Sequence, residues 1–186
     1  MKFILATTSP RRKQLFHFIY DKFDCVDAGF DESAVTSSDP AEVCYGFAKG
    51  KALSVADAYP NDCVLGFDTV VSVDGMILGK PHDSDEAYSM LHSLSGRKHT
   101  VLTAVYIVSA DFQGGFVSRT EVYFHRLSEE MIREYISSDE PYDKAGGYSI
   151  QGGASVFCEK IVGDYYTVMG LPVSLVYFKL KELGYL

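Results

Sequence analysis

The chain has 186 residues, 47% of them hydrophobic, and a formal net charge of −8 at pH 7. A chain of this length and apolar content can bury a substantial core as one domain, which we take as residues 1–186. The negative charge argues against a general nucleic-acid-binding surface, which requires a basic face, and no apolar run approaches the length that spans a membrane.

The start of the chain predicts a buried strand that leads directly into a helix. Residues 3–5 form the strand, Ser9 is a suitable N-cap, and Pro10 suits the first helical position. Arg11 and Arg12 lie in the first turn, where cations oppose the helix dipole. Two in succession indicate a negative ligand such as a phosphate chain, with a solvated basic turn as the equal alternative. On the dipole argument, removing Arg12 stabilises the empty protein slightly.

Helix and strand signals alternate along the rest of the chain. Asp39 with Glu42, and Asp83 with Glu86, have the spacing of capping boxes. The order of elements is not a doubly wound pattern and favours an α/β fold with a mixed sheet flanked by helices. The predicted strands are residues 23–28, 63–67, 70–73, 76–78, 99–109, 116–126 and 154–162, with an Asp74-Gly75 hairpin, and the further helices are residues 39–58, 83–94, 128–136 and 172–183.

Acidic residues stand at two informative places. Asp31 and Glu32 are adjacent in the polar loop before the second helix, where carboxylates suit a divalent ion, although ordinary loop solvation is the commoner explanation. Asp68 interrupts the apolar run of residues 65–71, where a carboxylate loses hydration unless it has a partner. Such a position favours a functional role, with a satisfied aspartate at a bulge or turn as the structural alternative.

Two lysines complete this set of polar residues. Lys80 follows the hairpin in Gly79-Lys80-Pro81 without any Walker motif, and Lys51 lies in a helix where lysine is also simply a good helix former. Together with the arginines and acids, they leave no obvious nucleophile. Metal-assisted phosphate chemistry therefore fits the residues better than acyl transfer does.

Cysteine and histidine add no metal site. The four cysteines are widely scattered without a Cys-x-x-Cys pair, which indicates neither a zinc site nor a disulfide framework. The first residues do not resemble a signal peptide, so we expect a reducing, cytoplasmic location. The five histidines lack metal-ligand spacing and are interpreted as surface or partner-satisfied residues.

Short motifs follow one another in order along nearly the whole chain. They are Leu5-Ala-Thr-Thr-Ser-Pro-Arg-Arg12, Asp31-Glu32, Ala48 with Lys51-Ala52, Gly66-Phe-Asp-Thr-Val-Val71, Gly79-Lys-Pro81, Leu94-Ser-Gly-Arg97 with His99, Glu140-Pro-Tyr-Asp-Lys-Ala-Gly146, Ile150-Gln-Gly152 and Gly170-Leu-Pro172. In this order they resemble the Maf family of nucleoside triphosphate pyrophosphatases, relatives of the inosine triphosphatase fold. The resemblance implies one Maf-like domain, built as a mixed twisted β-sheet flanked by helices with two lobes around a cleft.

The resemblance also implies a reaction. Members hydrolyse a nucleoside triphosphate between its α and β phosphates, giving a monophosphate and pyrophosphate with Mg²⁺ or Mn²⁺ as cofactor, and this house-cleaning prevents incorporation of non-canonical nucleotides. Asp68 matches the catalytic acid that acts as base toward the attacking water, and Glu32 with Asp68 matches the metal ligands. The implied triphosphate contacts are Ser9, Arg12, Lys51 and Lys80.

Base preference rests on three positions. Arg11, Thr69 and Gln151 resemble the subgroup that acts on dTTP, UTP and modified uridine triphosphates, whereas the subgroup preferring 7-methyl-GTP tends to carry other residues. The amide of Gln151 can pair with a uracil edge through one donor and one acceptor. We therefore predict a dTTP/UTP pyrophosphatase, with 7-methyl-GTP as the alternative substrate. Departures from the commonest pattern near the expected base pocket or its supporting strand are Gly147, Ser149 and Ala104.

A non-catalytic nucleotide-binding regulator is the alternative from another class, because the family is also associated with inhibition of septum formation. The retention of Asp68, Glu32 and both lysines argues against it, since a mere binder can dispense with them. The expected partner is a nucleoside triphosphate, without nucleic acid or membrane, and the family suggests a homodimer.

Overall fold

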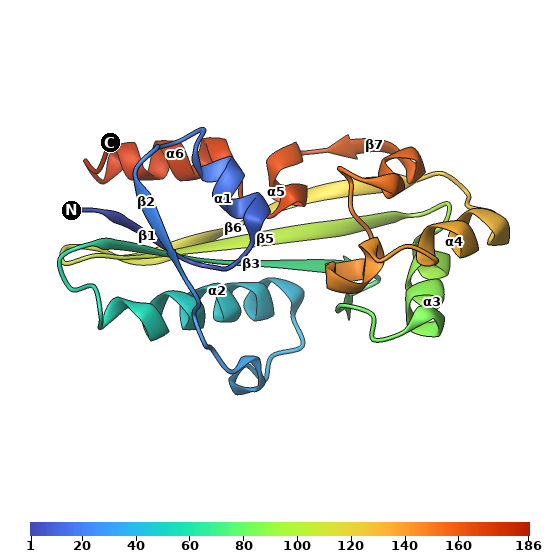
Figure 1. Cartoon of the computed structure of the whole chain (residues 1–186), viewed down its shortest axis with the longest axis horizontal. Helices are drawn as coiled ribbons and strands as arrows, with labels where there is room; N and C mark the ends of the chain where they lie inside the picture. Colours follow the sequence, from blue (N-terminus) through green and yellow to red (C-terminus); the bar gives the residue numbers. More distant parts are fainter.

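A seven-stranded mixed sheet forms the centre of the computed structural model, which describes residues 1–186 (Figure 1). Its strands are β1 (Phe3–Ala6), β2 (Phe23–Val26), β3 (Cys63–Val73), β4 (Met76–Leu78), β5 (Lys98–Val108), β6 (Gln113–Phe124) and β7 (Cys158–Val162). Their order is β2-β1-β3-β5-β6-β7, and β4 pairs with β3. Strand β1 is parallel to β2 and β3, whereas every other pair is antiparallel. The mixed sheet predicted from the order of elements is thereby confirmed.

Helices cover both faces and one end of this sheet. They are α1 (Pro10–Phe16), α2 (Pro40–Ala56), α3 (Ser84–Leu94), α4 (Glu129–Ile136), α5 (Tyr165–Met169) and α6 (Val173–Glu182). Figure 1 shows α2 along one face, α1 and α6 on the opposite face, and α3 beside α4 at the far end of the long strands. Four short 3₁₀ turns lie between them: η1 (Glu32–Ala34), η2 (Glu140–Asp143), η3 (Ala145–Gly147) and η4 (Gly153–Phe157).

The helix starts follow the N-cap residues read from the sequence. The Asp39 carboxylate accepts hydrogen bonds from the first turn of α2, and that of Asp83 accepts one from the first turn of α3. The reciprocal half of each expected capping box is absent, because the partner glutamates bond elsewhere. Glu42 accepts from the Ser37 hydroxyl at 2.6 Å, and Glu86 accepts from the His82 N–H at 2.7 Å.

Two large hydrophobic clusters divide the molecule into two lobes. One cluster packs α1 and α6 against the first half of β3, and includes Leu65 and Phe67. The other packs α3 and α4 against its second half, and includes Val71 and Val73. Strand β3 therefore runs through both cores, and the residues at its middle lie between the lobes.

A glycine allows α2 to pack directly on the centre of the sheet. A Cβ atom at Gly66 would lie 2.2 Å from the Ala48 carbonyl oxygen and 2.6 Å from the Ala52 nitrogen. Both of those alanines are fully buried. This close approach brings the turn of α2 between these alanines, which carries Lys51, against the middle of β3.

Four sequence-based expectations need correction. Strand 63–67 and strand 70–73 are one continuous strand, so Asp68 is at neither a bulge nor a turn. The expected strand 154–162 begins only at Cys158, since the residues before it form the turn η4. Helix α5 was not predicted, and the polar loop of residues 29–39 contains the turn η1.

Two general findings complete the description. No helix is long and apolar enough to cross a membrane. All four cysteines are free thiols.

Candidate active site

A cleft of about 560 Å³ lies between the two lobes. Its walls come from the start of α1, the middle of β3, the turn after β4, and residues 143–151. A second hollow of about 340 Å³ continues from it along residues 6–12 and shares Ser9, Lys51 and Lys80 with it. Every site residue predicted from the sequence lines this cleft: Ser9, Arg11, Arg12, Glu32, Lys51, Asp68, Thr69, Lys80 and Gln151.

Asp68 lies at the middle of the cleft on the side of β3 that faces α2. It is 8% exposed, and its backbone is paired with Ala104 of β5. Its Oδ1 accepts a hydrogen bond from Lys51 Nζ at 2.6 Å, and the same ammonium donates to Glu32 Oε1 at 2.8 Å. Two carboxylates thus converge on one cation.

Burial and charge act in opposite directions on this cluster. Burial raises the pKa of Asp68 above its usual range, although the nearby Lys51 and Arg12 oppose this. Burial disfavours the charge of Lys51, but Asp68 and Glu32 outweigh it and leave the lysine pKa above its ordinary value. Lys51 is therefore a permanent cation at neutral pH, beside a carboxylate that accepts a proton more readily than an exposed one.

Arg12, which we expected to contact a triphosphate, makes several hydrogen bonds within the protein. Its Nε donates to the Gly170 carbonyl at 2.9 Å, one terminal nitrogen donates to Thr7 Oγ1 at 3.3 Å, and the other donates to Thr69 Oγ1 at 3.1 Å. The guanidinium has five N–H donors, so only part of its capacity is free for a ligand in the cleft. Its contacts join α1 to β3 and to the segment after α5.

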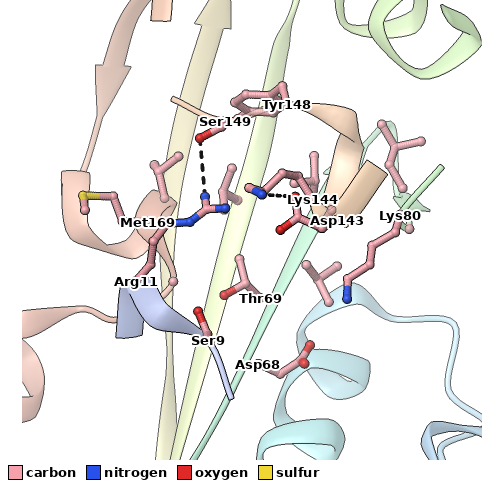
Figure 2. Close-up of a pocket in the computed structure, with 18 of the residues that line it drawn as sticks. Ser9, Arg11, Asp68, Thr69, Lys80, Asp143, Lys144, Tyr148, Ser149 and Met169 are labelled. Atoms are coloured by element: carbon pink, nitrogen blue, oxygen red, sulfur yellow. Dashed lines mark hydrogen bonds and ion pairs between the residues drawn. The ribbon is translucent and has the colours of Figure 1, made fainter. Parts of the chain in front are cut away.

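Arg11 points to the other wall of the cleft. Figure 2 shows it reaching from α1 to Ser149, with Lys80 on the far side and Thr69 and Asp68 between them. Its Nη1 donates to Ser149 Oγ at 3.4 Å. Burial lowers the pKa of Arg11, and the carboxylate of Glu140 opposes that shift.

The three positions expected to set base preference fall into two groups. Arg11 reaches the wall that carries Gln151, because its hydrogen-bond partner Ser149 lies two residues before Gln151. Thr69 is held separately, since its hydroxyl is 3.0 Å from the Thr103 hydroxyl and also accepts from Arg12. The cleft therefore carries both groups, although they do not touch each other.

Lys80 and Ser9 line both the cleft and the hollow that continues from it. The Lys80 side chain is exposed and forms no ion pair. The backbone beside it is anchored, because the Gly79 carbonyl accepts a hydrogen bond from the Gly146 N–H at 2.8 Å. Ser9 Oγ accepts from the Arg12 N–H at 3.5 Å as the N-cap of α1.

Residues 143–149 form a wall whose side chains sequence reasoning left without a role. Lys144 pairs with Asp143, and the buried ring of Tyr148 lines the cleft. The Tyr148 hydroxyl lies 2.8 Å from His99 Nε2, so this core histidine has a partner at one ring nitrogen, whereas its buried Nδ1 has none. The available signal was the motif of residues 140–146 with the glycine pair Gly146 and Gly147, whose positive φ angles of 72° and 69° allow a sharp turn in this wall.

The acidic pair fits a divalent cation. Glu32 and Asp68 direct oxygen atoms at the same point, where Lys51 Nζ now provides the positive charge. Mg²⁺ is commonly held by one or two carboxylates together with substrate phosphates and water. The chain has no group of three or more His, Cys, Asp or Glu side chains arranged for a metal. Asp31 instead accepts a hydrogen bond from the Ser33 N–H.

Comparisons with known proteins agree with this geometry. The model of the Maf-like protein family matches residues 2–183. A dTTP/UTP pyrophosphatase of Geobacillus sp. (strain WCH70) is 46% identical over 182 residues, which cover 98% of each chain. A dTTP/UTP pyrophosphatase of Carboxydothermus hydrogenoformans is 43% identical over the whole of both chains. The solved structure of a HAM1 protein from Coxiella burnetii has the same overall fold, with a TM-score of 0.52 at 12% identity and coverage of 98% of this chain and 99% of that one.

Proposed function

Because the chain belongs to the family of Maf-like proteins, we propose that its cleft hydrolyses nucleoside triphosphates, with dTTP and UTP preferred. The bond cleaved is the one between the α and β phosphates, and the products are a nucleoside monophosphate and pyrophosphate. The observation that carries this proposal is the ion-paired cluster of the buried Asp68, Lys51 and the exposed Glu32, in a cleft that five lysine and arginine side chains line.

Asp68 is the proposed general base. Lys51 occupies its Oδ1, which leaves Oδ2 as the acceptor for a proton of the attacking water. As the water oxygen bonds to phosphorus, the proton passes to Asp68, and the bridging oxygen leaves with the other phosphoryl group. The raised pKa of Asp68 favours that transfer, because a stronger base accepts a proton at lower cost.

The cationic residues are the proposed triphosphate contacts. Lys80, Lys51 and Ser9 line both hollows, so all three can approach phosphate oxygens there. Fixed positive charges in a site that excludes much of the water stabilise the charge that develops on the leaving phosphates. Arg12 contributes to the same wall, mainly by holding the start of α1 in place.

Glu32 and Asp68 are the proposed ligands of a divalent ion, Mg²⁺ or Mn²⁺. Such an ion, when bound, would offset phosphate charge and help to orient the substrate. Lys51 would share the same two carboxylates and keep them aligned. Chelation by EDTA should therefore abolish turnover, and the two ions should be compared by adding each back.

Base selection is assigned to Arg11, Thr69 and Gln151. Gln151 is exposed on the cleft wall, and its amide offers the donor and acceptor that a uracil or thymine edge requires. A cytoplasmic location is part of the same proposal, since the four thiols are free as in reducing compartments. A homodimer is a further expectation, which light scattering on the purified protein tests.

The test is a turnover screen with product identification. The wild-type protein is incubated with dTTP, UTP, dGTP and 7-methyl-GTP, and the products are separated by ion-exchange chromatography. The proposal requires dTMP and pyrophosphate from dTTP, at a higher kcat/KM than for either purine nucleotide. Release of dTDP and phosphate would refute the cleavage position, a preference for 7-methyl-GTP would move the chain to the alternative substrate, and no turnover would favour a nucleotide-binding regulator.

A further inference from the structure

The five residues 149–153 form a short loop on the wall of the cleft, here called the 149–153 loop. Its first three residues line the cleft, and Gln151 is at its centre. The loop is closed on itself by a hydrogen bond from the Gly152 N–H to the Ser149 carbonyl at 3.1 Å. Its position relative to the sheet therefore decides where Gln151 points.

Two side chains outside the loop hold its two ends. The Ser149 N–H donates to the hydroxyl of Tyr135, in α4, at 3.1 Å. The Gly153 N–H donates to Oε2 of Glu140, at the start of η2, at 2.9 Å. Both acceptors belong to the α4–η2 segment, which packs in the core of the far lobe. The loop is thus clamped at each end to one rigid support.

The carboxylate of Glu140 has a feature that a simple backbone anchor does not need. Its Oε1 atom is buried and makes no hydrogen bond of good geometry, although the carboxylate also acts on the Tyr135 hydroxyl and contributes to raising the pKa of Tyr135. A buried carboxylate oxygen without a donor is costly, and a neutral glutamine would serve the Gly153 N–H equally well. The charge therefore calls for another explanation.

Arg11 provides that explanation. Burial lowers the pKa of Arg11, and Glu140 is the largest influence in the opposite direction. Arg11 also donates to Ser149 Oγ, at the first residue of the loop. The negative charge of Glu140 thus lies beneath the loop and favours the cation that reaches the loop from α1.

The loop backbone rests directly on this carboxylate. A Cβ atom at Gly152 would lie 1.8 Å from Glu140 Oε1, so with a side chain at position 152 the Glu140 carboxylate must leave its present place or the loop must move. Gly152 has a φ of −113°, so the close contact, and not a left-handed backbone, is what excludes a side chain there.

We propose that Glu140 is a positioning residue for base selection, which holds the 149–153 loop and Arg11 in register so that Gln151 meets the pyrimidine edge. This inference rests on the proposed function, because it deepens the assignment of the base pocket. Removal of a purely structural anchor would lower the stability of the protein and would weaken the binding of every nucleotide alike. A positioning residue changes the preference between bases on the same preparation of protein.

The test measures equilibrium binding, by calorimetry, of the α,β-methylene analogues of dTTP and dGTP. Glu140→Ala removes both the acceptor and the charge, whereas Glu140→Gln keeps an acceptor for Gly153 and removes only the charge. Glu130→Gln, on the exposed side of α4, is the matched control. We expect Glu140→Ala to weaken binding of the dTTP analogue roughly 10- to 100-fold and binding of the dGTP analogue far less. The affinity of Glu140→Gln for the dTTP analogue should be intermediate, and that of Glu130→Gln should equal that of the wild type.

Equal weakening of both analogues by Glu140→Ala, or no weakening of either, would overturn the proposal. The binding readout also separates this inference from the proposed reaction. Wild-type protein that binds the dTTP analogue without hydrolysing dTTP would refute the proposed reaction. The ratio of the dissociation constants of the two analogues would still test the role of Glu140. Wild-type protein that binds neither analogue refutes both.

A second variant pair tests the contact itself. Gly152→Ala alone should impair binding of the dTTP analogue about as much as Glu140→Ala does, because the new methyl group displaces the Glu140 carboxylate from the loop. In the double variant, the shortened residue 140 leaves space for that methyl group, so the two losses should not add. Additive losses would show that Gly152 does not act through Glu140 and would overturn the clamp.

Discussion

Arg12 links three elements through one side chain, and this changes what its removal should do. The helix dipole opposes a cation at this position by only about 0.3–1 kcal/mol. Against that stand hydrogen bonds to Gly170, Thr7 and Thr69, whose acceptors lose their partner in an alanine variant. The slight stabilisation expected from the dipole alone is therefore replaced by an expected loss.

We predict that Arg12→Ala lowers the free energy of unfolding by about 1–3 kcal/mol. Arg11→Ala is the matched control, since Arg11 makes one long hydrogen bond of 3.4 Å and should change stability far less. Urea denaturation of both variants measures the difference. An Arg12→Ala protein as stable as wild type would restore the dipole argument.

His99 makes stability depend on pH in a defined window. Burial lowers its pKa from 6.5 to about 4. The unfolded chain therefore binds a proton below pH 6.5 that the folded protein refuses until about pH 4. Stability from this residue is complete above pH 6.5 and is lost as the pH falls toward 4.

The expected loss across that window is roughly 2–4 kcal/mol. His99→Gln cannot titrate, so its free energy of unfolding should fall less steeply over the same range. Denaturant titrations at several pH values, with both proteins in the same buffers, give the two slopes. Parallel curves would mean that other groups cause the acid sensitivity.

At the scale of elements, β3 and α2 build the site by touching each other at Gly66. Gly66→Ala places a methyl group within 2.2 Å of the Ala48 carbonyl oxygen, so α2 must move away from the sheet. We expect a loss of about 3 kcal/mol or more in unfolding free energy, together with loss of activity as Lys51 shifts from Asp68. Gly79→Ala is the control for stability, because an added Cβ there meets nothing within 4 Å. Thermal melts that rank the two variants equally would contradict this account of the packing.

Local chemistry made most elements predictable from the sequence. The N-caps Ser9, Asp39 and Asp83 each precede a helix in the structure, and Asp74-Gly75 forms the expected hairpin. Helix α5 escaped prediction because its five residues carry no apolar period, although Asp164 caps it and Gly170 ends it. The prediction of two separate strands in place of β3 was wrong because we interpreted Asp68 as an interruption of the apolar run. In the structure, the ammonium group of Lys51 balances the charge of Asp68 within the continuous strand.

At the scale of the whole molecule, the cleft arises where two separate cores meet across the continuous strand β3. Asp68 could be predicted as a functional residue from the sequence, because a carboxylate among buried side chains requires a partner. The contribution of Tyr148 and Ser149 could not be predicted. It depends on contacts with His99 and Tyr135, which are distant in the chain. The clamp by Glu140 depends likewise on a loop 13 residues away.

The most direct test of the account is the behaviour of Asp68→Asn, measured for turnover of dTTP and for binding of its α,β-methylene analogue. The asparagine has nearly the same shape and keeps an acceptor for Lys51, but it cannot take a proton from water. We predict a folded protein that binds the analogue about as well as wild type and hydrolyses dTTP roughly 10²–10⁴-fold more slowly. Turnover close to that of wild type would contradict the central claim and would move the role of base to Glu32.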